Sequence, residues 1–159
     1  KNNSAPQDQL ILLDFGAVRS YPDSFLIPYR KMIKAAILRD TSQLEKASLD
    51  LQLIQKDDPP QLKKLFVDFC YLTVEPFLPA TQSKSPFMSV DGIYDWKNSD
   101  LPKRLTQLGL QIVKEFPLRT PPREIVFLDR KTGGVFIFLS VLGAKIKASE
   151  IIRKYLEGA

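Results

Sequence analysis

The sequence predicts a mainly α-helical protein with a short strand or hairpin at its N-terminal end. Through most of the chain, apolar residues recur three and four positions apart, which is the spacing of amphipathic helices. Proline, aspartate and serine stand where these segments begin, and such residues favour helix entry. Near the N-terminus, four consecutive aliphatic residues at 10–13 are typical of a short buried strand.

The size and composition of the chain indicate one globular domain. Its 159 residues are 44% apolar and 26% charged, which is enough to bury a core. We divide the domain, residues 1–159, into a polar lead-in at 1–9, a strand and turn at 10–16, and a helical body at 24–157. The chain starts at Lys1 without a targeting pattern, so we interpret it as a segment of a longer protein or a chain with a processed start.

Residue content excludes several classes of site. The net charge is +5, but the basic residues are spread along the chain without interleaved aromatic residues, so we predict no nucleic-acid partner. One cysteine, Cys70, and no histidine exclude an internal disulfide, a Cys/His zinc site and a histidine-based triad. The longest apolar run, 135–144, is about half the length of a membrane span, so we predict no transmembrane segment.

Two helices are predicted after the strand. The first begins at residues 22–24, which form a helix-entry signal, and Pro28 is tolerated in its first turn because backbone donors are free there. The second follows a break at residues 40–42, where Ser42 and Glu45 have the form of a capping box. Both segments carry the apolar stripe of helices that pack on a core.

A third helix, a long loop and a fourth helix are expected in the middle of the chain. We predict Asp58 as the N-cap of the third helix, and Cys70 on its apolar face as a buried thiol without a nucleophilic role. Residues 79–100 show no period, and we favour an ordered loop fixed by its aromatic side chains over a ligand-stacking role. Asp100 or Ser99 is expected to cap the fourth helix.

The C-terminal part is predicted to hold a buried helix and a last amphipathic helix. Residues 135–144 are apolar all round, which is typical of a helix in the core. We interpret Gly133-Gly134 as close backbone packing at the entry of that helix, and a phosphate-binding helix start is the less favoured alternative. The last helix is expected at residues 149–157.

Three charged residues, Glu124, Asp129 and Arg130, lie beside strongly apolar neighbours. We expect a partly buried ion pair or a helix-capping carboxylate in this segment. The alternative is a catalytic acid–base pair of Glu124 and Asp129, which no histidine, lysine cluster or glycine-rich loop supports. We therefore assign no catalytic residue in this chain.

The candidate functional residues are Asp14, Phe15 and Gly16, which follow the predicted strand directly. A carboxylate held at the end of a rigid strand can bind the Mg²⁺ that bridges ATP phosphates. Phe15 would pack into the core and orient the turn, and Gly16 would let the backbone leave the strand at unusual angles. The tripeptide alone is a weak signal, and the preceding strand and the helical sequel strengthen it.

Two segments of the chain resemble the UbiB (AarF) family of atypical kinases. Residues 12–16 resemble the metal-binding motif of the family, and residues 121–136 resemble its C-terminal signature. The element Tyr94-Asp95-Trp96 and the helical region between the two segments also fit, so the resemblance covers residues 10–146. It implies that this chain is the helical C-terminal lobe of a protein-kinase-like fold.

The resemblance also implies the cofactors, the site and the setting of the protein. ATP and Mg²⁺ would bind at Asp14, Phe15 and Gly16, with Asp14 as the metal ligand. The implied activity is that of a transferase of the atypical kinase class, or an ATPase, that supports the biosynthesis of ubiquinone or a related isoprenoid quinone. Quinone-biosynthesis proteins or an isoprenoid lipid at a membrane face would be its partners. The implied location is the cytoplasm, at the bacterial inner membrane, or the matrix face of a mitochondrial membrane.

Other parts of the family's site are not found in this sequence. They are the nucleotide-binding lysine, the alanine-rich phosphate loop, the Lys-Gly-Gln element and the catalytic-loop Asp and Asn. We therefore expect residues 1–159 alone to be inactive. A second hypothesis, from another class, is a non-catalytic helical interaction module that docks to a protein partner or a membrane surface. The amphipathic helices and the mild positive charge favour it.

Overall fold

A computed structural model describes residues 19–115 and 120–156 of the chain. This part is mainly α-helical, which confirms the predicted fold class. The predicted strand and turn at 10–16, including Asp14, Phe15 and Gly16, lie outside the described residues. Within the described ranges, none of the helices combines the length and the apolar character that a membrane span needs.

The described ranges contain six α-helices, one 3-10 helix and two short strands. They are α1 (Asp23–Leu38), α2 (Thr41–Asp50), α3 (Pro60–Thr73), η1 (Glu75–Phe77), β1 (Tyr94–Asp95), α4 (Leu101–Glu115), α5 (Arg123–Val141), β2 (Lys145–Ile146) and α6 (Ala148–Leu156). The strands pair antiparallel, with Tyr94 opposite Ile146 and Asp95 opposite Lys145. This pairing, which we did not predict, ties the loop before α4 to the segment between α5 and α6.

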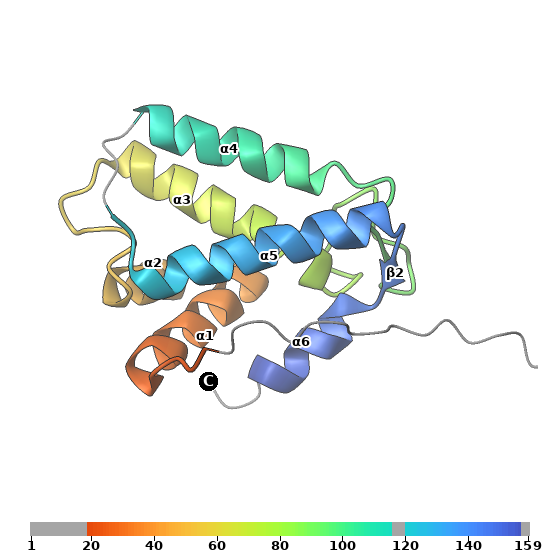
Figure 1. The fold of residues 1–159 in the computed structure, drawn as a ribbon, viewed down its shortest axis with the longest axis horizontal. Helices are drawn as coiled ribbons and strands as arrows, with labels where there is room; N and C mark the ends of the chain where they lie inside the picture. Colours follow the sequence, from red (N-terminus) through yellow and green to blue (C-terminus); the bar gives the residue numbers. More distant parts are fainter. Residues whose placement is uncertain (1–18, 116–119, 157–159) are drawn as a thin grey trace, which may run out of the picture.

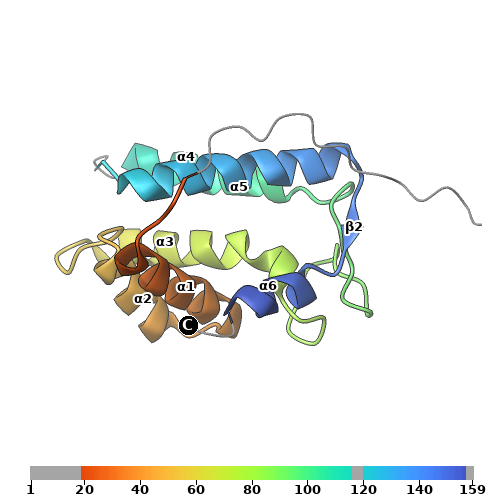
Figure 2. The ribbon, with the colours of Figure 1, turned by 60° about the horizontal axis from the view of Figure 1, so that its bottom comes forward.

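The helices are arranged in two layers, as Figures 1 and 2 show. One layer holds α4 and α5, and the other holds α1, α2, α3 and α6. Within the second layer α1 packs against α2, and α3 contacts both of them and also α4. The two layers are therefore joined chiefly through α3 at one end and through the β1–β2 pairing at the other.

The larger core lies among α1, α2 and α3. Its buried side chains are spaced three and four residues apart on each helix, as expected for amphipathic helices. They include Phe25, Met32, Ala35 and Ala36 of α1, Leu44 and Ala47 of α2, and Val67 and Cys70 of α3. Cys70 is buried, which confirms its predicted place on the apolar face of the helix.

A second, smaller core is built from aromatic side chains of the long loop. Tyr94 and Trp96 are only 0% and 1% exposed. The Trp96 ring lies 5.1 Å from that of Tyr94 and 4.9 Å from that of Phe136 on α5, measured between ring centroids. The loop at 79–100 is thus fixed to the body by its aromatic residues, as predicted.

The structure corrects two of the predicted helix caps. Asp40 caps α2 by accepting a hydrogen bond from the Gln43 backbone N–H at 3.0 Å, so the capping box predicted at Ser42 is wrong. Asp58 accepts the backbone N–H of Gln55 at 2.7 Å and does not cap α3. Pro59 occupies the N-cap position instead, and a proline follows it at the first helical position, where its missing N–H costs nothing.

Other helix ends lie close to their predicted places. The Ser99 hydroxyl accepts the backbone N–H of Leu101 at 3.1 Å, as one of our two capping alternatives required. Pro28 lies in the second turn of α1 rather than the first, so it removes one helical hydrogen bond. The last helix, α6, begins one residue before the predicted start at residue 149.

Helix α5 differs most from the prediction. It runs without a break from Arg123 to Val141, so Gly133 and Gly134 lie in its middle. A methyl group added to either glycine would meet nothing within 4 Å, which contradicts the predicted close packing. Their place in the middle of the helix contradicts the alternative of a phosphate-binding helix start. The expected core helix is also wrong, because Phe138 is 51% exposed and Val141 is 79% exposed.

Candidate functional site

The predicted metal-binding turn precedes the first described residue, Arg19, by only three positions. Asp14, Phe15 and Gly16 lie outside the described residues, so their roles stay predictions. The described residues form no group of three or more His, Cys, Asp or Glu side chains that could hold a metal ion. Asp14 therefore stays the metal ligand that we predict from the sequence.

Arg19 joins the segment after the predicted turn to the start of α5. Its guanidinium lies 3.4 Å from the Glu124 carboxylate and stacks over the Phe127 ring, 4.5 Å from the centroid. This contact is the partly buried ion pair expected around Glu124. Asp129 does not join it, because five residues on a helix separate the two carboxylates by about 140° around the axis. The alternative of a Glu124–Asp129 acid–base pair is not supported by this geometry.

A polar network around Glu75 fixes the long loop to η1 and α4. The Glu75 carboxylate accepts hydrogen bonds from the Tyr94 hydroxyl at 2.7 Å and the Ser85 hydroxyl at 2.8 Å. Arg104 of α4 donates to both carboxylate oxygens, at 2.7 and 2.8 Å, which is a bidentate ion pair. Arg104 also donates to Asp100 at 2.6 Å. We did not predict this network, because its members are far apart in the chain.

The electrostatics of this network indicate a structural role, which is to hold the loop in place. Burial disfavours the charged form of Glu75, but hydrogen bonds from Arg104, Tyr94 and Ser85 outweigh it and hold the pKa of Glu75 below its usual range. Burial, together with the nearby Glu75 charge, raises the pKa of the Tyr94 phenol. The carboxylate stays ionised and the phenol stays protonated at neutral pH, so neither group is suited to proton transfer.

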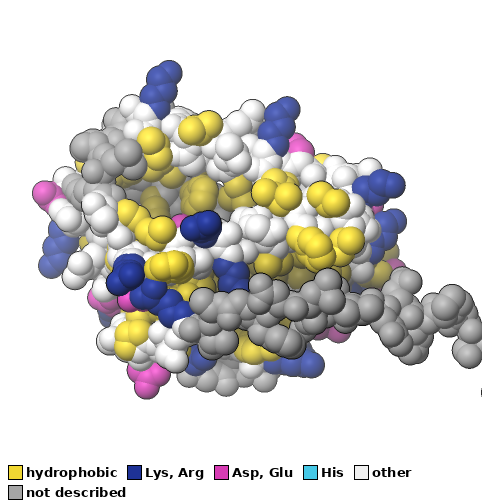
Figure 3. Space-filling view, in the orientation of Figure 1, with side chains coloured by type: hydrophobic (Ala, Val, Ile, Leu, Met, Phe, Trp, Pro, Cys, Tyr) yellow, Lys and Arg dark blue, Asp and Glu magenta, His cyan; other side chains and the backbone are white. Residues whose placement is uncertain are grey.

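A cavity of about 610 Å³ lies between the two helical layers. Residues from α1, α3, α4, α5 and α6 line it, and most of them are apolar. Figure 3 shows hydrophobic side chains in the recess between α4 and α5. The polar lining residues include Asp129 and Thr132 of α5, which face the cavity from one side.

Burial makes three titratable groups along this cavity, Cys70, Tyr29 and Asp129, harder to ionise. Burial raises the pKa of the Cys70 thiol to about 12, and the Asp129 charge adds to the shift. The same two causes raise the pKa of the Tyr29 phenol to about 12. Cys70 is thus a protonated thiol, which agrees with its predicted lack of a nucleophilic role. Burial also raises the pKa of Asp129.

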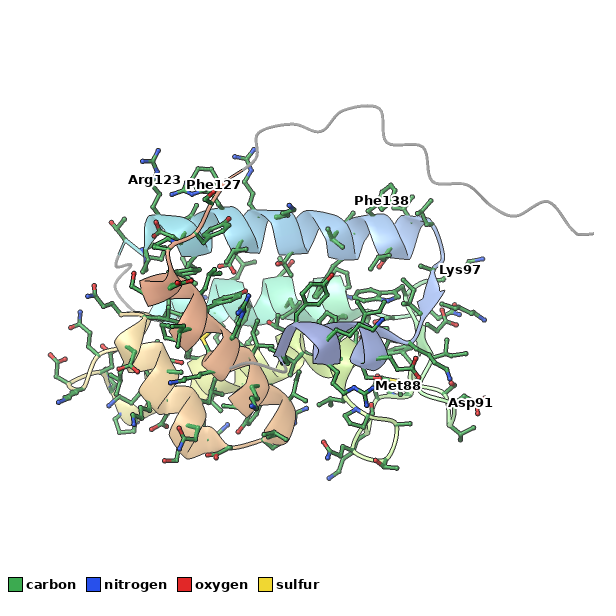
Figure 4. All side chains as sticks on the ribbon, turned by 90° about the horizontal axis from the view of Figure 1, so that it is seen from below. Met88, Asp91, Lys97, Arg123, Phe127 and Phe138 are labelled. Carbon is green, nitrogen blue, oxygen red and sulfur yellow. The ribbon has the colours of Figure 1, made fainter. Side chains whose placement is uncertain are left out.

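The outer face of α5 carries an exposed apolar patch. We define the patch by Val135, Ile137, Phe138, Val141 and Leu142, each between 46% and 79% exposed. Figure 4 shows Phe138, Phe127 and Arg123 on the side of α5 that points away from the other helices. Exposed cations, Arg123, Arg130 and Lys131, lie on the N-terminal half of the same helix. Such a patch marks a surface that can be covered by a partner.

Comparison with known proteins relates the whole chain to one group of kinases. No family model matches the chain. It is 29% identical over 91% of its length to the probable serine/threonine-protein kinase abkA of Dictyostelium discoideum, and 28% identical over 90% to the mitochondrial atypical kinase COQ8 of Saccharomyces cerevisiae. The mitochondrial atypical kinase COQ8B of Rattus norvegicus is 26% identical over 94% of the chain.

The chain spans about a quarter of the length of these curated relatives, 25% for the first and 26% for the other two. A match over nine-tenths of the chain necessarily includes the Glu75 network in its middle. The similarity confirms the resemblance expected from the sequence: this chain is similar, over nearly its whole length, to the COQ8 atypical kinases of the UbiB family.

Proposed function

We propose that this chain forms the helical C-terminal lobe of an atypical kinase or ATPase. The observation that carries the proposal is the similarity to COQ8 atypical kinases over about 90% of the chain. The mainly α-helical architecture of the described residues supports it, because a helical lobe is expected to follow the metal-binding turn of a kinase-like fold. The quarter-length match to the relatives fits a lobe rather than a whole enzyme.

In this proposal Asp14 holds Mg²⁺ and the metal neutralises charge on the phosphates of ATP. Phe15 orients the turn by packing into the helical lobe, and Gly16 supplies the backbone freedom that the turn needs. The ion pair of Arg19 with Glu124 supports this arrangement, since it ties the segment just after the turn to the first turn of α5. In this proposal the Glu75 network fixes the long loop and has no role in nucleotide binding.

The chain alone is proposed to be inactive. A single metal-binding carboxylate cannot hold ATP without a lysine and a phosphate-binding loop, and the sequence offers neither. The test is Mg²⁺-dependent ATP hydrolysis by residues 1–159, compared with the protein that includes the coding sequence upstream of Lys1. We expect turnover in the longer protein only. Turnover by residues 1–159 alone, or an upstream sequence without a lysine-bearing strand and an Asp followed by Asn, would contradict the proposal.

The proposed setting is quinone biosynthesis at a membrane face. Two of the relatives are mitochondrial atypical kinases by name, which supports the matrix face of a mitochondrial membrane over a bacterial inner membrane. The expected phenotype is a lower content of ubiquinone, or of the related isoprenoid quinone, in cells that carry Asp14→Asn. Mass spectrometry of quinone extracts measures it, and an unchanged quinone content would separate this setting from the proposed ATPase activity.

A second candidate function is a docking module, and the apolar patch on α5 favours it. The patch has five apolar side chains on one exposed surface, with cations at the other end of the helix. Such a surface fits an anionic membrane, which attracts Arg and Lys and accepts apolar side chains. Sedimentation with anionic vesicles should fall for Phe138→Ser and stay unchanged for Val90→Ser, because Val90 is an exposed residue of the loop at 79–100, outside the patch. Equal binding of both variants would remove this candidate.

A further inference from the structure

The cavity between the two helical layers has the size and lining of a small-molecule site. Its volume of about 610 Å³ lies within the usual range for ligand cavities. The apolar lining comes from both layers. Ile33 of α1, Phe69 of α3 and Ile152 of α6 line the cavity from one layer, and Ile112 of α4 lines it from the other. An elongated apolar molecule can therefore contact several helices at once.

The charge of the lining is negative. Among the described residues, the lining includes two carboxylates, Asp58 and Asp129, and no Lys or Arg. Asp58 is engaged by the backbone N–H of Gln55 at 2.7 Å. Among the residues that the structure describes, none donates a hydrogen bond to Asp129 or forms an ion pair with it. Asp129 is thus the carboxylate that can accept a group from a ligand.

The neighbours of Asp129 do not compensate its charge. Tyr29 of α1 and Cys70 of α3 share the cavity with it, and both are neutral at pH 7 because their pKa values are near 12. Asp129 keeps an exposed part, but the apolar and neutral groups on its cavity side remove some of its hydration without giving it a partner. A cation entering the cavity would supply that partner, and an anion would be repelled.

We propose that this cavity binds an apolar molecule with a single cationic amine head, which pairs with Asp129 while its hydrocarbon body packs against α1, α3 and α4. The proposal does not rest on the nucleotide role proposed for Asp14, so the two can be tested independently. Thr132, one turn from Asp129 on α5, lies where it can accept or donate a further hydrogen bond to the head group.

Three probes of equal chain length test the charge preference. Dodecylamine, dodecanol and dodecanoate are titrated into residues 1–159 by calorimetry, below the concentrations at which they form micelles. We expect one site per chain and an affinity for dodecylamine at least about tenfold higher than that for dodecanoate, with dodecanol between them. Equal affinities of the amine and the carboxylate for the wild-type chain would overturn the proposal.

Asp129→Asn tests the partner of the head group. The variant keeps the shape of the side chain and removes its charge, so the ratio of amine to carboxylate affinity should fall to about one. The affinity for dodecanol should change by less than about threefold. An unchanged preference for the amine would show that Asp129 is not the partner.

Gly109→Leu tests the place of the hydrocarbon body. Gly109 of α4 lines the cavity, and an added Cβ would lie 3.8 Å from the Phe69 ring, an ordinary contact. Leucine should fill part of the cavity and lower the affinity for all three probes at least about tenfold. Gly134→Leu is the matched control, since Gly134 lies on α5 with open space around it, and its affinities should equal those of the wild type.

If Gly109→Leu does not fold, the place of the hydrocarbon body can be tested in the wild-type protein by measuring contacts directly. Nuclear Overhauser contacts between the dodecyl chain and the Ile112 methyl groups are expected in the wild-type complex. Contacts to the Phe138 ring alone would place the probe on the outer patch of α5 and would overturn the cavity assignment.

Discussion

Two carboxylates of this chain, Glu75 and Asp129, show how different two neighbouring regions of one small fold can be. Glu75 sits in a corner where Arg104, Tyr94 and Ser85 all donate hydrogen bonds to it. Asp129 faces a largely apolar cavity, and none of the described residues donates to it. Consequently the pKa of Glu75 is lowered and that of Asp129 is raised.

The difference separates a structural role from a binding role. In the Glu75 corner each polar group is satisfied by another part of the chain, so the corner is complete and holds the loop in place. The cavity at Asp129 and the apolar patch on α5 are surfaces that the described residues leave uncovered. We expect substitutions in the Glu75 network to change the stability of the fold, and we expect ligands or partners to bind at α5.

Removing the Glu75 carboxylate should have the largest effect. Glu75→Ala leaves Arg104 and Tyr94 without their shared partner, so the free energy of unfolding should fall by about 3 kcal/mol. Urea unfolding measures it. Glu150→Ala, which removes an exposed partner of Lys147, is the control and should cost less than about 0.5 kcal/mol. Similar losses in the free energy of unfolding for the two variants would mean that the Glu75 network does not stabilise the fold.

Two glycine substitutions, one in each region, should have opposite signs. Gly133→Ala lies in the open middle of α5 and should raise the free energy of unfolding by about 1 kcal/mol, because alanine favours the helix. Gly143→Ala lies next to β2 at φ +63°, where a side chain is strained, and should lower it by about 1 kcal/mol. Thermal unfolding of both variants measures the signs. Destabilisation by Gly133→Ala would indicate that α5 is covered at this point.

The two carboxylates should also give opposite pH dependence. Because the folded-state pKa of Glu75 is lowered, its contribution is present at neutral pH and lost as pH falls through that pKa. Because the folded-state pKa of Asp129 is raised, stability is lost as pH rises through the ordinary carboxylate range and above it. Asp129→Asn should remove only the second loss. The change in stability should be smaller than those expected for the Glu75 and glycine substitutions, since Asp129 is an exposed residue.

Unfolding curves of wild type and Asp129→Asn between pH 3 and 8 measure this difference. The two curves should converge at low pH, where Asp129 is protonated, and separate at neutral pH with the variant more stable. A variant that is less stable than the wild type at pH 7 would mean that the Asp129 carboxylate has a partner.

The sequence predicted helices and their buried faces well, because apolar spacing is a local property. Cys70 and the aromatic residues Tyr94 and Trp96 are buried as their patterns indicated. The pattern did not distinguish Asp40 from Ser42 as the cap of α2, since both residue types accept the same backbone hydrogen bond. Choices of this kind depend on where the chain turns, which the local sequence does not fix.

Long-range arrangements could not be predicted from local patterns. Glu75 and Arg104 are 29 residues apart and meet only because η1 and α4 pack together. Residues 135–144 are apolar all round, which indicates burial but not the surface that buries them. In the structure this surface is not supplied by the described residues, so the core prediction was wrong while the apolar character was correct.

We propose above all that this chain carries the metal-binding carboxylate of an ATP-dependent atypical kinase. The most direct test is Mg²⁺-dependent ATP hydrolysis by the longer protein with Asp14→Asn, compared with Asp8→Asn as a control outside the motif. We predict that Asp14→Asn abolishes turnover with the fold intact by circular dichroism, and that Asp8→Asn retains wild-type turnover. Equal turnover in both variants, or none in the wild type, would contradict the claim and favour the docking function of α5.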